Sequence, residues 1–173
     1  LLQSRTPKRL DVHMFETDSD VLPILRANMK EAKETLHDVG HQLDYIIDER
    51  DFILDVAGRR AGSLFDEEGT LSDFDGVITN PPYFKINKNS DYARALSDVV
   101  HGQPNIYSLF LAQAATCLRA GGEMVAITPR SFCNGLYFRE FRKWLLGQMS
   151  LENVHLFGSR TGTFREANVL QES

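Results

Sequence analysis

A short polar and aromatic segment follows an apolar run near the middle of the chain. Residues 76–79 are followed by Asn80, Pro81, Pro82 and Tyr83. Because the prolines fix their own φ angles and lack N–H donors, the segment presents backbone carbonyls, one side-chain amide and one phenol ring. These groups can accept hydrogen bonds from an amine and stack on a flat ring. The segment therefore predicts a binding site for an exocyclic amino group.

Attack by such an amine on a methyl group is difficult because the nitrogen lone pair is delocalised into a ring or a carbonyl. The Asn80 side-chain oxygen and the Pro81 carbonyl can both accept from one NH2 group, which favours the pyramidal nitrogen of the transition state. An Asn-Pro pair alone is common where a strand enters a loop. The complete tetrad after an apolar run favours the catalytic interpretation, with Tyr83 stacked on the substrate.

The tetrad and its strand resemble the catalytic motif of amino-group methyltransferases that use S-adenosylmethionine. Residues 105–110, 118–132 and 164–173 resemble successive blocks of the adenine-N6 DNA methyltransferases, in particular the methylase domain of bifunctional, Type IIG-like restriction-modification enzymes. The similarity covers nearly the whole chain. It implies a Rossmann-like α/β fold, mostly a parallel sheet with helices on both faces. It also implies methylation of a flipped adenine in double-stranded DNA as part of a restriction-modification system.

The same resemblance implies which residues bind the cofactor S-adenosylmethionine. Glu16, at the end of the first predicted strand, would accept hydrogen bonds from the ribose hydroxyls. Asp51 would accept from the adenine amino group and Phe52 would flank that ring, while Asn80 is assigned to the cofactor as well as to the amine. Open parallel sheets bind ligands beyond the carboxyl ends of their strands, which agrees with these positions.

Phe164 lies in a short polar loop where it has no apolar stripe to join. In the family that the chain resembles, an aromatic residue of this block stacks on the flipped adenine, on the face opposite the one that Tyr83 covers. Each such stack is worth roughly 1–3 kcal/mol, comparable with the cost of unstacking the target base. A place in the core is the alternative for Phe164.

The net charge of −5 argues weakly against a self-sufficient DNA-binding surface, since phosphate contacts normally require a basic face. Lys85 and Lys88 nevertheless follow the tetrad, and Arg130 follows a later predicted strand. These residues would border a nucleic-acid groove, and a simple solvated surface is the evenly weighted alternative.

Apolar runs and helical stripes alternate along the chain, as in an α/β sheet with helices on its faces. A first helix, with Ser19 as its cap and Pro23 in its first turn, is expected to end at Gly40. Its predicted buried stripe comprises Leu22, Leu25, Met29, Ala32 and Leu36. The predicted strands are 12–15, 43–47, 76–79, 124–127 and 153–157, the further helices 106–118 and 136–146, and the irregular connections 58–72 and 87–103.

With 173 residues, 42% of them hydrophobic, the chain is large enough for one domain with a core, interpreted as a partial catalytic domain over residues 1–173. No apolar run approaches the ~20 residues of a membrane span and no signal peptide is recognisable, so a protein of the bacterial cytoplasm is expected. Cys117 and Cys133 have neither metal spacing nor a nucleophile motif and are interpreted as ordinary thiols. Direct methyl transfer requires no metal, and no metal ligands are assigned.

A glycine-rich loop for the methionine part of the cofactor is expected before the strand that leads to Glu16, and residues 1–9 leave no room for it. By the same resemblance, a target-recognition domain would follow residue 173, and the parent enzyme could also carry a nuclease domain. The sequence is therefore interpreted as a methylase core that is incomplete at its N-terminal strand and has little or no activity by itself.

Other functions remain open at this point. Methylation of a glutamine amide in a protein, or of a guanine amine in RNA, would use the same grip on an amino group. A non-catalytic DNA-binding or assembly module is an alternative from a different class. Substrate assays distinguish the first pair from DNA methylation, and cofactor-independent DNA binding distinguishes the last.

Overall fold

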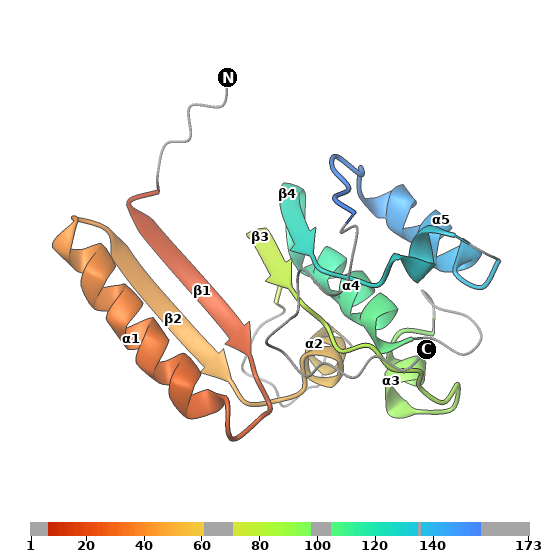
Figure 1. Ribbon diagram of the computed structural model, residues 1–173, viewed down its shortest axis with the longest axis horizontal. Coiled ribbons are helices and arrows are strands. Elements are labelled where there is room, and N and C mark those ends of the chain that lie inside the picture. The colour runs from red at the N-terminus through yellow and green to blue at the C-terminus, as the bar shows by residue number, and fades with distance from the viewer. Residues whose placement is uncertain (1–6, 61–70, 98–104, 135, 157–173) are drawn as a thin grey trace. The chain divides into compact units, whose positions relative to one another are not determined.

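The computed structural model describes residues 7–60, 71–97, 105–134 and 136–156 (Figure 1). The chain divides into two compact units, Leu1–Asp55 and Val56–Ser173, and each unit is described by itself. The described strands form two parallel pairs, one in each unit. Parallel strands with intervening helices confirm the predicted α/β class.

The first unit is a strand–helix–strand motif. Strand β1 (Arg9–Phe15) pairs in parallel with β2 (Gln42–Asp48), and helix α1 (Leu22–Asp38) connects them and packs against β2. Each predicted strand is confirmed and extends further than predicted. Because the strands are parallel, Phe15 and Asp48 face each other at the carboxyl end of the pair, so the loops after both strands emerge from one edge.

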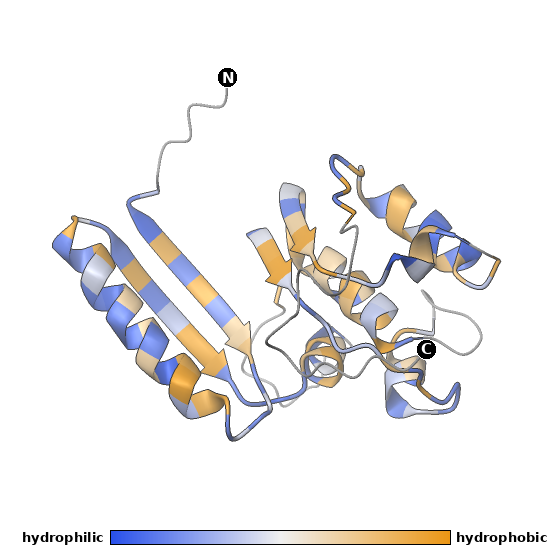
Figure 2. Ribbon diagram, viewed as in Figure 1, coloured by the Kyte–Doolittle hydropathy of each residue, from blue (hydrophilic) through white to orange (hydrophobic). Residues whose placement is uncertain are grey.

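Helix α1 confirms the predicted apolar stripe. Leu22 is buried, and the other members of the stripe, Leu25, Met29, Ala32 and Leu36, are half-buried. Figure 2 shows the alternation of hydrophobic and hydrophilic residues along this helix. The predicted Ser19 cap is wrong. The N-cap is Val21, which makes no side-chain cap bond, and the N–H groups of Val21 and Leu22 donate instead to the Asp18 carbonyl.

Helix α2 (Phe52–Arg60) is an element that the sequence interpretation missed, because the apolar run that begins it is short. The Asp51 side chain caps it, since Oδ1 accepts from the Leu54 N–H at 3.0 Å. Ile53 and Val56 are buried. The predicted irregular connection 58–72 is therefore wrong at residues 58–60, and residues 61–70 lie outside the described part of the chain.

In the second unit, strand β3 (Phe74–Thr79) pairs in parallel with β4 (Leu118–Ala126). Helix α4 (Ile106–Cys117) precedes β4, packs against it, and is buried along most of its length. The pairing shifts register between Phe74 and Gly76, opposite the Gly121-Gly122 turn. A Cβ at Gly122 would lie 3.0 Å from the Phe74 carbonyl oxygen, so the close approach of the two strands requires glycine there.

The remaining elements correct several sequence-based boundaries. Helix α3 (Asp91–Ala95) forms inside the predicted connection 87–103, with Ser90 as its N-cap. A 3-10 turn, η1 (Arg130–Cys133), follows β4, and α5 (Arg139–Gln148) begins later than the predicted residue 136 because Phe138 is its N-cap. Residues 98–104 lie outside the described part.

The predicted strand 153–157 is wrong over its described residues, which form no strand. Val154 and Leu156 are 56% and 66% exposed, so the apolar pattern there is not matched by a neighbouring strand that would bury it. Residue 157 lies outside the described part. Among the described residues, no helix is both long and apolar enough to cross a membrane.

Candidate active site

The predicted amine-binding tetrad lies at the carboxyl end of β3. Thr79 is the last residue of the strand, and Asn80 follows it directly with its side chain exposed. The ladder to β4 continues past the last paired residues, because the Ile127 N–H donates to the Thr79 carbonyl at 3.1 Å. The carboxyl ends of β3 and β4 therefore share one edge, which is where open parallel sheets bind ligands.

The Tyr83 hydroxyl joins the tetrad to the end of β4. Its oxygen lies 2.7 Å from Asn80 Oδ1 and 2.9 Å from the Ile127 carbonyl oxygen. Burial raises the pKa of Tyr83, so its hydroxyl keeps its proton at ordinary pH. Pro81 is buried and Pro82 is exposed. The structure thus brings the side chains of Asn80 and Tyr83 together.

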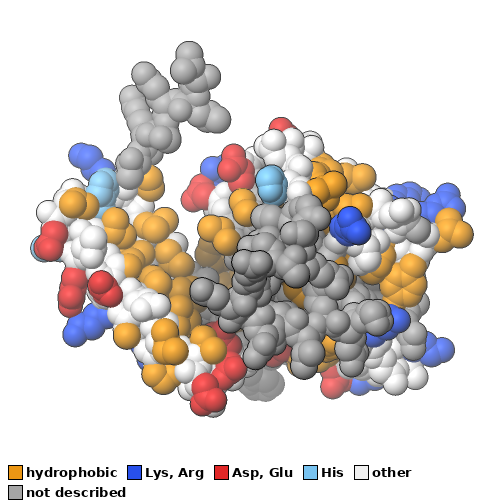
Figure 3. Space-filling view, in the orientation of Figure 1, with side chains coloured by type: hydrophobic (Ala, Val, Ile, Leu, Met, Phe, Trp, Pro, Cys, Tyr) orange, Lys and Arg blue, Asp and Glu red, His pale blue; other side chains and the backbone are white. Residues whose placement is uncertain are grey.

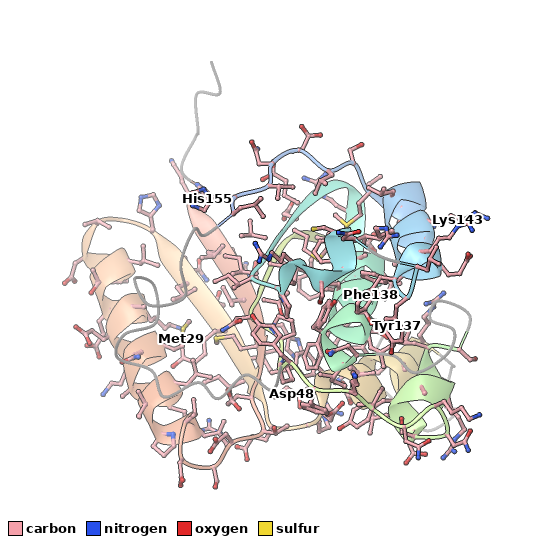
Figure 4. The ribbon with its side chains drawn as sticks, turned by 45° about the vertical axis from the view of Figure 1, so that its right-hand side comes forward. Met29, Asp48, Tyr137, Phe138, Lys143 and His155 are labelled. Carbon is pink, nitrogen blue, oxygen red and sulfur yellow. The ribbon has the colours of Figure 1, made fainter. Side chains whose placement is uncertain are left out.

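Aromatic packing supports the Tyr83 ring from behind. Tyr107, in α4, meets the Tyr83 ring edge-on with centroids 6.3 Å apart, and its hydroxyl lies 3.1 Å from Ser131 Oγ. Tyr107 packs in turn on Phe138, which Figure 4 labels beside Tyr137. Burial raises the pKa of Tyr107 to about 12, which keeps this hydroxyl neutral. Sequence reasoning gave Tyr107 no role, although a tyrosine within an otherwise apolar helix is a usable signal.

The segment after the tetrad is tied to the start of α4. Lys85 forms an isolated antiparallel bridge with Asn105, and the Ile106 N–H donates to the Phe84 carbonyl at 2.9 Å. Asn105 is the N-cap of α4, with its side chain accepting from the Tyr107 N–H. The loop that carries Tyr83 is therefore held at both of its ends.

The three cations predicted to border DNA, Lys85, Lys88 and Arg130, are all exposed. On the face shown in Figure 3, Lys and Arg side chains are scattered over several elements rather than gathered in one continuous patch. Exposure is compatible with either a nucleic-acid groove or a solvated surface, and the DNA-binding role of these residues stays a prediction.

The predicted cofactor residues lie at the carboxyl edge of the β1–β2 pair in the first unit. Glu16 directly follows β1, and its N–H donates to the Asp48 carbonyl at 3.0 Å. Asp51 and Phe52 follow β2, and Phe52 meets the Phe15 ring edge-on with centroids 5.2 Å apart. This edge therefore brings together carboxylates and an aromatic ring, a set of groups suited to a ligand with hydroxyls and a flat base.

An ion-pair clamp that sequence reasoning missed holds the turn between β2 and α2. Arg50 donates from Nε to Asp48 Oδ1 at 2.8 Å and from Nη2 to Asp48 Oδ2 at 2.6 Å. Its Nη1 lies 2.9 Å from Asp55 Oδ1, in the first turn of α2. Arg50 therefore bridges the strand end and the helix start, with Asp51 and Phe52 between them. The charged run 48–51 after an apolar strand was the available signal.

The Arg50 guanidinium holds the pKa of the Asp48 carboxyl far below its usual range, against the opposing effect of burial. Asp48, labelled in Figure 4, is only 8% exposed. His13 also approaches it, with Nε2 3.5 Å from Asp48 Oδ2, and the His13 ring stacks on Phe15 at 4.8 Å. Polar and aromatic contacts thus fix the residues around the predicted cofactor site.

The predicted site residues fall into two clusters. Glu16, Asp51 and Phe52 lie together in the first unit, and Asn80 and Tyr83 lie together in the second. Phe164 lies outside the described residues, so its stacking opposite Tyr83 stays a prediction.

The two cysteines have different environments. Cys117 is buried, and burial raises its pKa to about 11, which makes it a poor nucleophile. Cys133 is exposed in η1. The properties of Cys117 agree with the interpretation of an ordinary thiol.

Comparisons with known proteins show which family the chain belongs to. The chain is 40% identical over 169 residues to the Type II methyltransferase M.BsuBI of Bacillus subtilis. The matched region covers 95% of this chain and 32% of that protein. It is 48% identical over 100 residues to the Type II methyltransferase M.PstI of Providencia stuartii, covering 58% of this chain and 20% of that protein. The chain thus spans about a third or less of the length of these relatives. The Eco57I restriction-modification methylase family matches residues 13–164, and the chain belongs to this family.

Proposed function

We propose that this chain carries the catalytic centre of a restriction-modification methyltransferase that methylates adenine N6 in DNA, with S-adenosylmethionine as methyl donor. The observation that carries the proposal is the exposed Asn80 side chain at the carboxyl end of β3, beside the Tyr83 ring. Membership of a restriction-modification methylase family and relatives named Type II methyltransferases support it.

In this mechanism the Asn80 side-chain oxygen and the Pro81 carbonyl accept both hydrogens of the adenine amino group. These bonds draw the nitrogen lone pair out of conjugation, and they strengthen as the nitrogen becomes tetrahedral. S-adenosylmethionine, held by Glu16, Asp51 and Phe52, would supply an electrophilic methyl group for the nitrogen to attack and a thioether as the leaving group. The surplus proton then leaves the nitrogen for solvent. Holding both reactants in line contributes much of the rate.

The target base would reach this site by leaving the DNA helix, because its amino group is inaccessible inside the stack. The Tyr83 ring offers one stacking surface, and Phe164 is proposed to offer the other. Base stacking on aromatic side chains is worth roughly 1–3 kcal/mol per base and offsets part of the cost of unstacking.

The cofactor would lie at the carboxyl edge of β1 and β2. Glu16 is assigned to its ribose hydroxyls, Asp51 to its adenine amino group and Phe52 to the face of that ring. The half-buried position of all three residues supports this assignment. One Asp51 oxygen already accepts from the Leu54 N–H, so the cap of α2 holds the carboxylate in a fixed orientation.

The test uses the full-length gene product that contains these 173 residues and S-adenosylmethionine labelled in its methyl group. DNA, RNA and a protein mixture are offered as substrates. We expect label in DNA only, and we expect Asn80→Ala to lower the rate by about 10²–10³-fold, as for loss of a transition-state hydrogen bond. Asn89→Ala is the matched control, because Asn89 is an exposed asparagine in the turn before α3.

Two other outcomes would contradict the proposal. Label in RNA or protein but not in DNA would move the same amine-binding site to a guanine or glutamine substrate. DNA binding that is salt-sensitive, independent of cofactor and unaffected by Asn80→Ala, with no methylation of any substrate, would indicate a non-catalytic module.

A further inference from the structure

The hydrogen bonds around Tyr83 contain a conflict between acceptors. The Tyr83 hydroxyl oxygen lies within hydrogen-bond distance of both Asn80 Oδ1, at 2.7 Å, and the Ile127 carbonyl oxygen, at 2.9 Å. A phenol hydroxyl has one proton, so it makes one well-aligned hydrogen bond, to one of these acceptors. The other contact would then bring two oxygens together with no proton between them, which is repulsive.

The conflict disappears if the Asn80 amide is turned by 180° about its last side-chain bond. The two ends of an asparagine amide have nearly the same shape, and the hydrogen-bond network decides which end is which. The Ile127 carbonyl can only accept, so it must take the Tyr83 proton. The Asn80 atom that faces Tyr83 must then be the donor, Nδ2, and Asn80 Oδ1 points away from the hydroxyl.

We propose that the Tyr83 hydroxyl is a positioning group, which receives a hydrogen bond from Asn80 Nδ2, donates to the Ile127 carbonyl and so directs Asn80 Oδ1 toward the substrate amine. This inference rests on the proposed function and adds a second role to Tyr83. The ring stacks on the base, and the hydroxyl sets the orientation of the catalytic amide. Phenylalanine at this position would supply the ring alone.

Neighbouring contacts hold the two groups that orient the Asn80 amide, the Tyr83 ring and the Ile127 carbonyl. Ile127 is held to β3 because its N–H donates to the Thr79 carbonyl, one residue before Asn80. The Tyr83 ring is held by edge-on contact with Tyr107. Ile127 is therefore attached to the end of β3, next to Asn80, and the Tyr83 ring is held against α4.

Without the hydroxyl, the Asn80 amide would be free to present its NH2 end to the substrate amine, where two donors repel. A rotated amide cannot help the transition state, yet it leaves the stacking surface intact. The inference therefore predicts a loss in kcat with little change in KM for DNA.

A double-mutant cycle on the full-length gene product tests this coupling. We expect Tyr83→Phe to lower kcat by about 10- to 100-fold while KM for DNA changes by less than about 3-fold. In the Asn80→Ala background the same change should cost less than about 2-fold, because the group that the hydroxyl orients is gone. Tyr137→Phe is the matched control, since Tyr137 belongs to the same aromatic cluster and is 53% exposed.

The two proposals fail separately in this experiment. A wild-type kcat in Tyr83→Phe would overturn the positioning role, and so would additive losses in the double variant. The proposed function would still stand if the Asn80→Ala variant is inactive. Full activity in Asn80→Ala would overturn the proposed function itself.

A second measurement does not depend on catalytic activity, so it tests the positioning role even when a variant is inactive for other reasons. In the ¹⁵N-asparagine-labelled protein, the Asn80 side-chain amide should show slow hydrogen exchange that Tyr83→Phe abolishes and Tyr137→Phe leaves intact. Unchanged exchange in Tyr83→Phe would show that the hydroxyl does not hold the amide, and the inference would be wrong.

Discussion

The ends of β2 and β3 each lie at the carboxyl edge of a parallel strand pair, and they are held by different chemistry. At the end of β2, Arg50 joins Asp48 to Asp55 through charged hydrogen bonds. At the end of β3, neutral groups of Asn80, Tyr83 and Ile127 hold one another. At the end of β2, the hydrogen bonds hold a turn in position, and the strength of charged bonds serves that purpose. At the end of β3, the neutral groups present the Asn80 amide, which must accept hydrogen bonds while it stays uncharged.

Among the variants that distinguish the two strand ends, we expect Arg50→Leu to have the largest effect on stability. It removes the Arg50 guanidinium from the largely buried carboxylates of Asp48 and Asp55, and we expect a loss of about 3 kcal/mol in the free energy of unfolding. Arg9→Leu is the matched control in the same unit, since the Arg9–Asp11 pair is exposed and its removal should not change stability measurably. Urea denaturation measures both variants. Equal effects would show that the clamp is no stronger than a surface ion pair.

A smaller effect is expected at the β3 end from Gly122→Ala. The added Cβ would meet the Phe74 and Arg119 carbonyl oxygens at 3.0 and 3.1 Å, and both contacts are backbone atoms that cannot turn aside. We expect a loss of about 2 kcal/mol in unfolding free energy and a lower methylation rate, because the β3–β4 ladder carries Asn80. Gly147→Ala, whose Cβ meets nothing within 4 Å, should not destabilise the protein. An undisturbed Gly122→Ala variant would contradict the tight register at this turn.

The smallest of these effects is the acid response of the β2 end. Because the folded-state pKa of Asp48 is lowered, its contribution to stability is fully present above the unfolded-state pKa of about 3.9 and is lost as pH falls toward the folded value. Unfolding free energy measured between about pH 6 and pH 3 should therefore decrease toward acid. Asp48→Asn should reduce this slope, while Asn80→Ala should leave it unchanged. The same slope in Asp48→Asn would locate the acid sensitivity elsewhere.

The sequence was informative where its signal is local. The β3 strand and the Asn80 to Tyr83 tetrad at its end follow from an apolar run and its punctuation, and the stripe from Leu22 to Leu36 predicts α1. The Ser19 cap was wrong, and so was the predicted strand over its described residues 153–156, because a capping side chain and a strand each need a partner that local pattern does not specify.

The contacts that hold the ends of β2 and β3 could not be predicted from local sequence patterns. Tyr83 meets the Ile127 carbonyl across 44 positions of sequence, and a backbone acceptor has no side-chain signature. Arg50 acts over a short range, but the charged residues near it in sequence, Asp48, Glu49, Asp51 and Asp55, are all acidic, and the sequence does not indicate which of them it binds. Roles that depend on long-range contacts or on a choice among charges require the folded chain.

The most direct test of the central proposal is the identity of the methylated nucleoside. DNA treated with the full-length gene product and S-adenosylmethionine is digested to nucleosides and analysed by mass spectrometry, beside the same reaction with Asn80→Ala. We expect N6-methyladenine, in an amount that falls at least about 100-fold in the variant. Methylation confined to cytosine, or N6-methyladenine that persists unchanged in Asn80→Ala, would contradict the proposal.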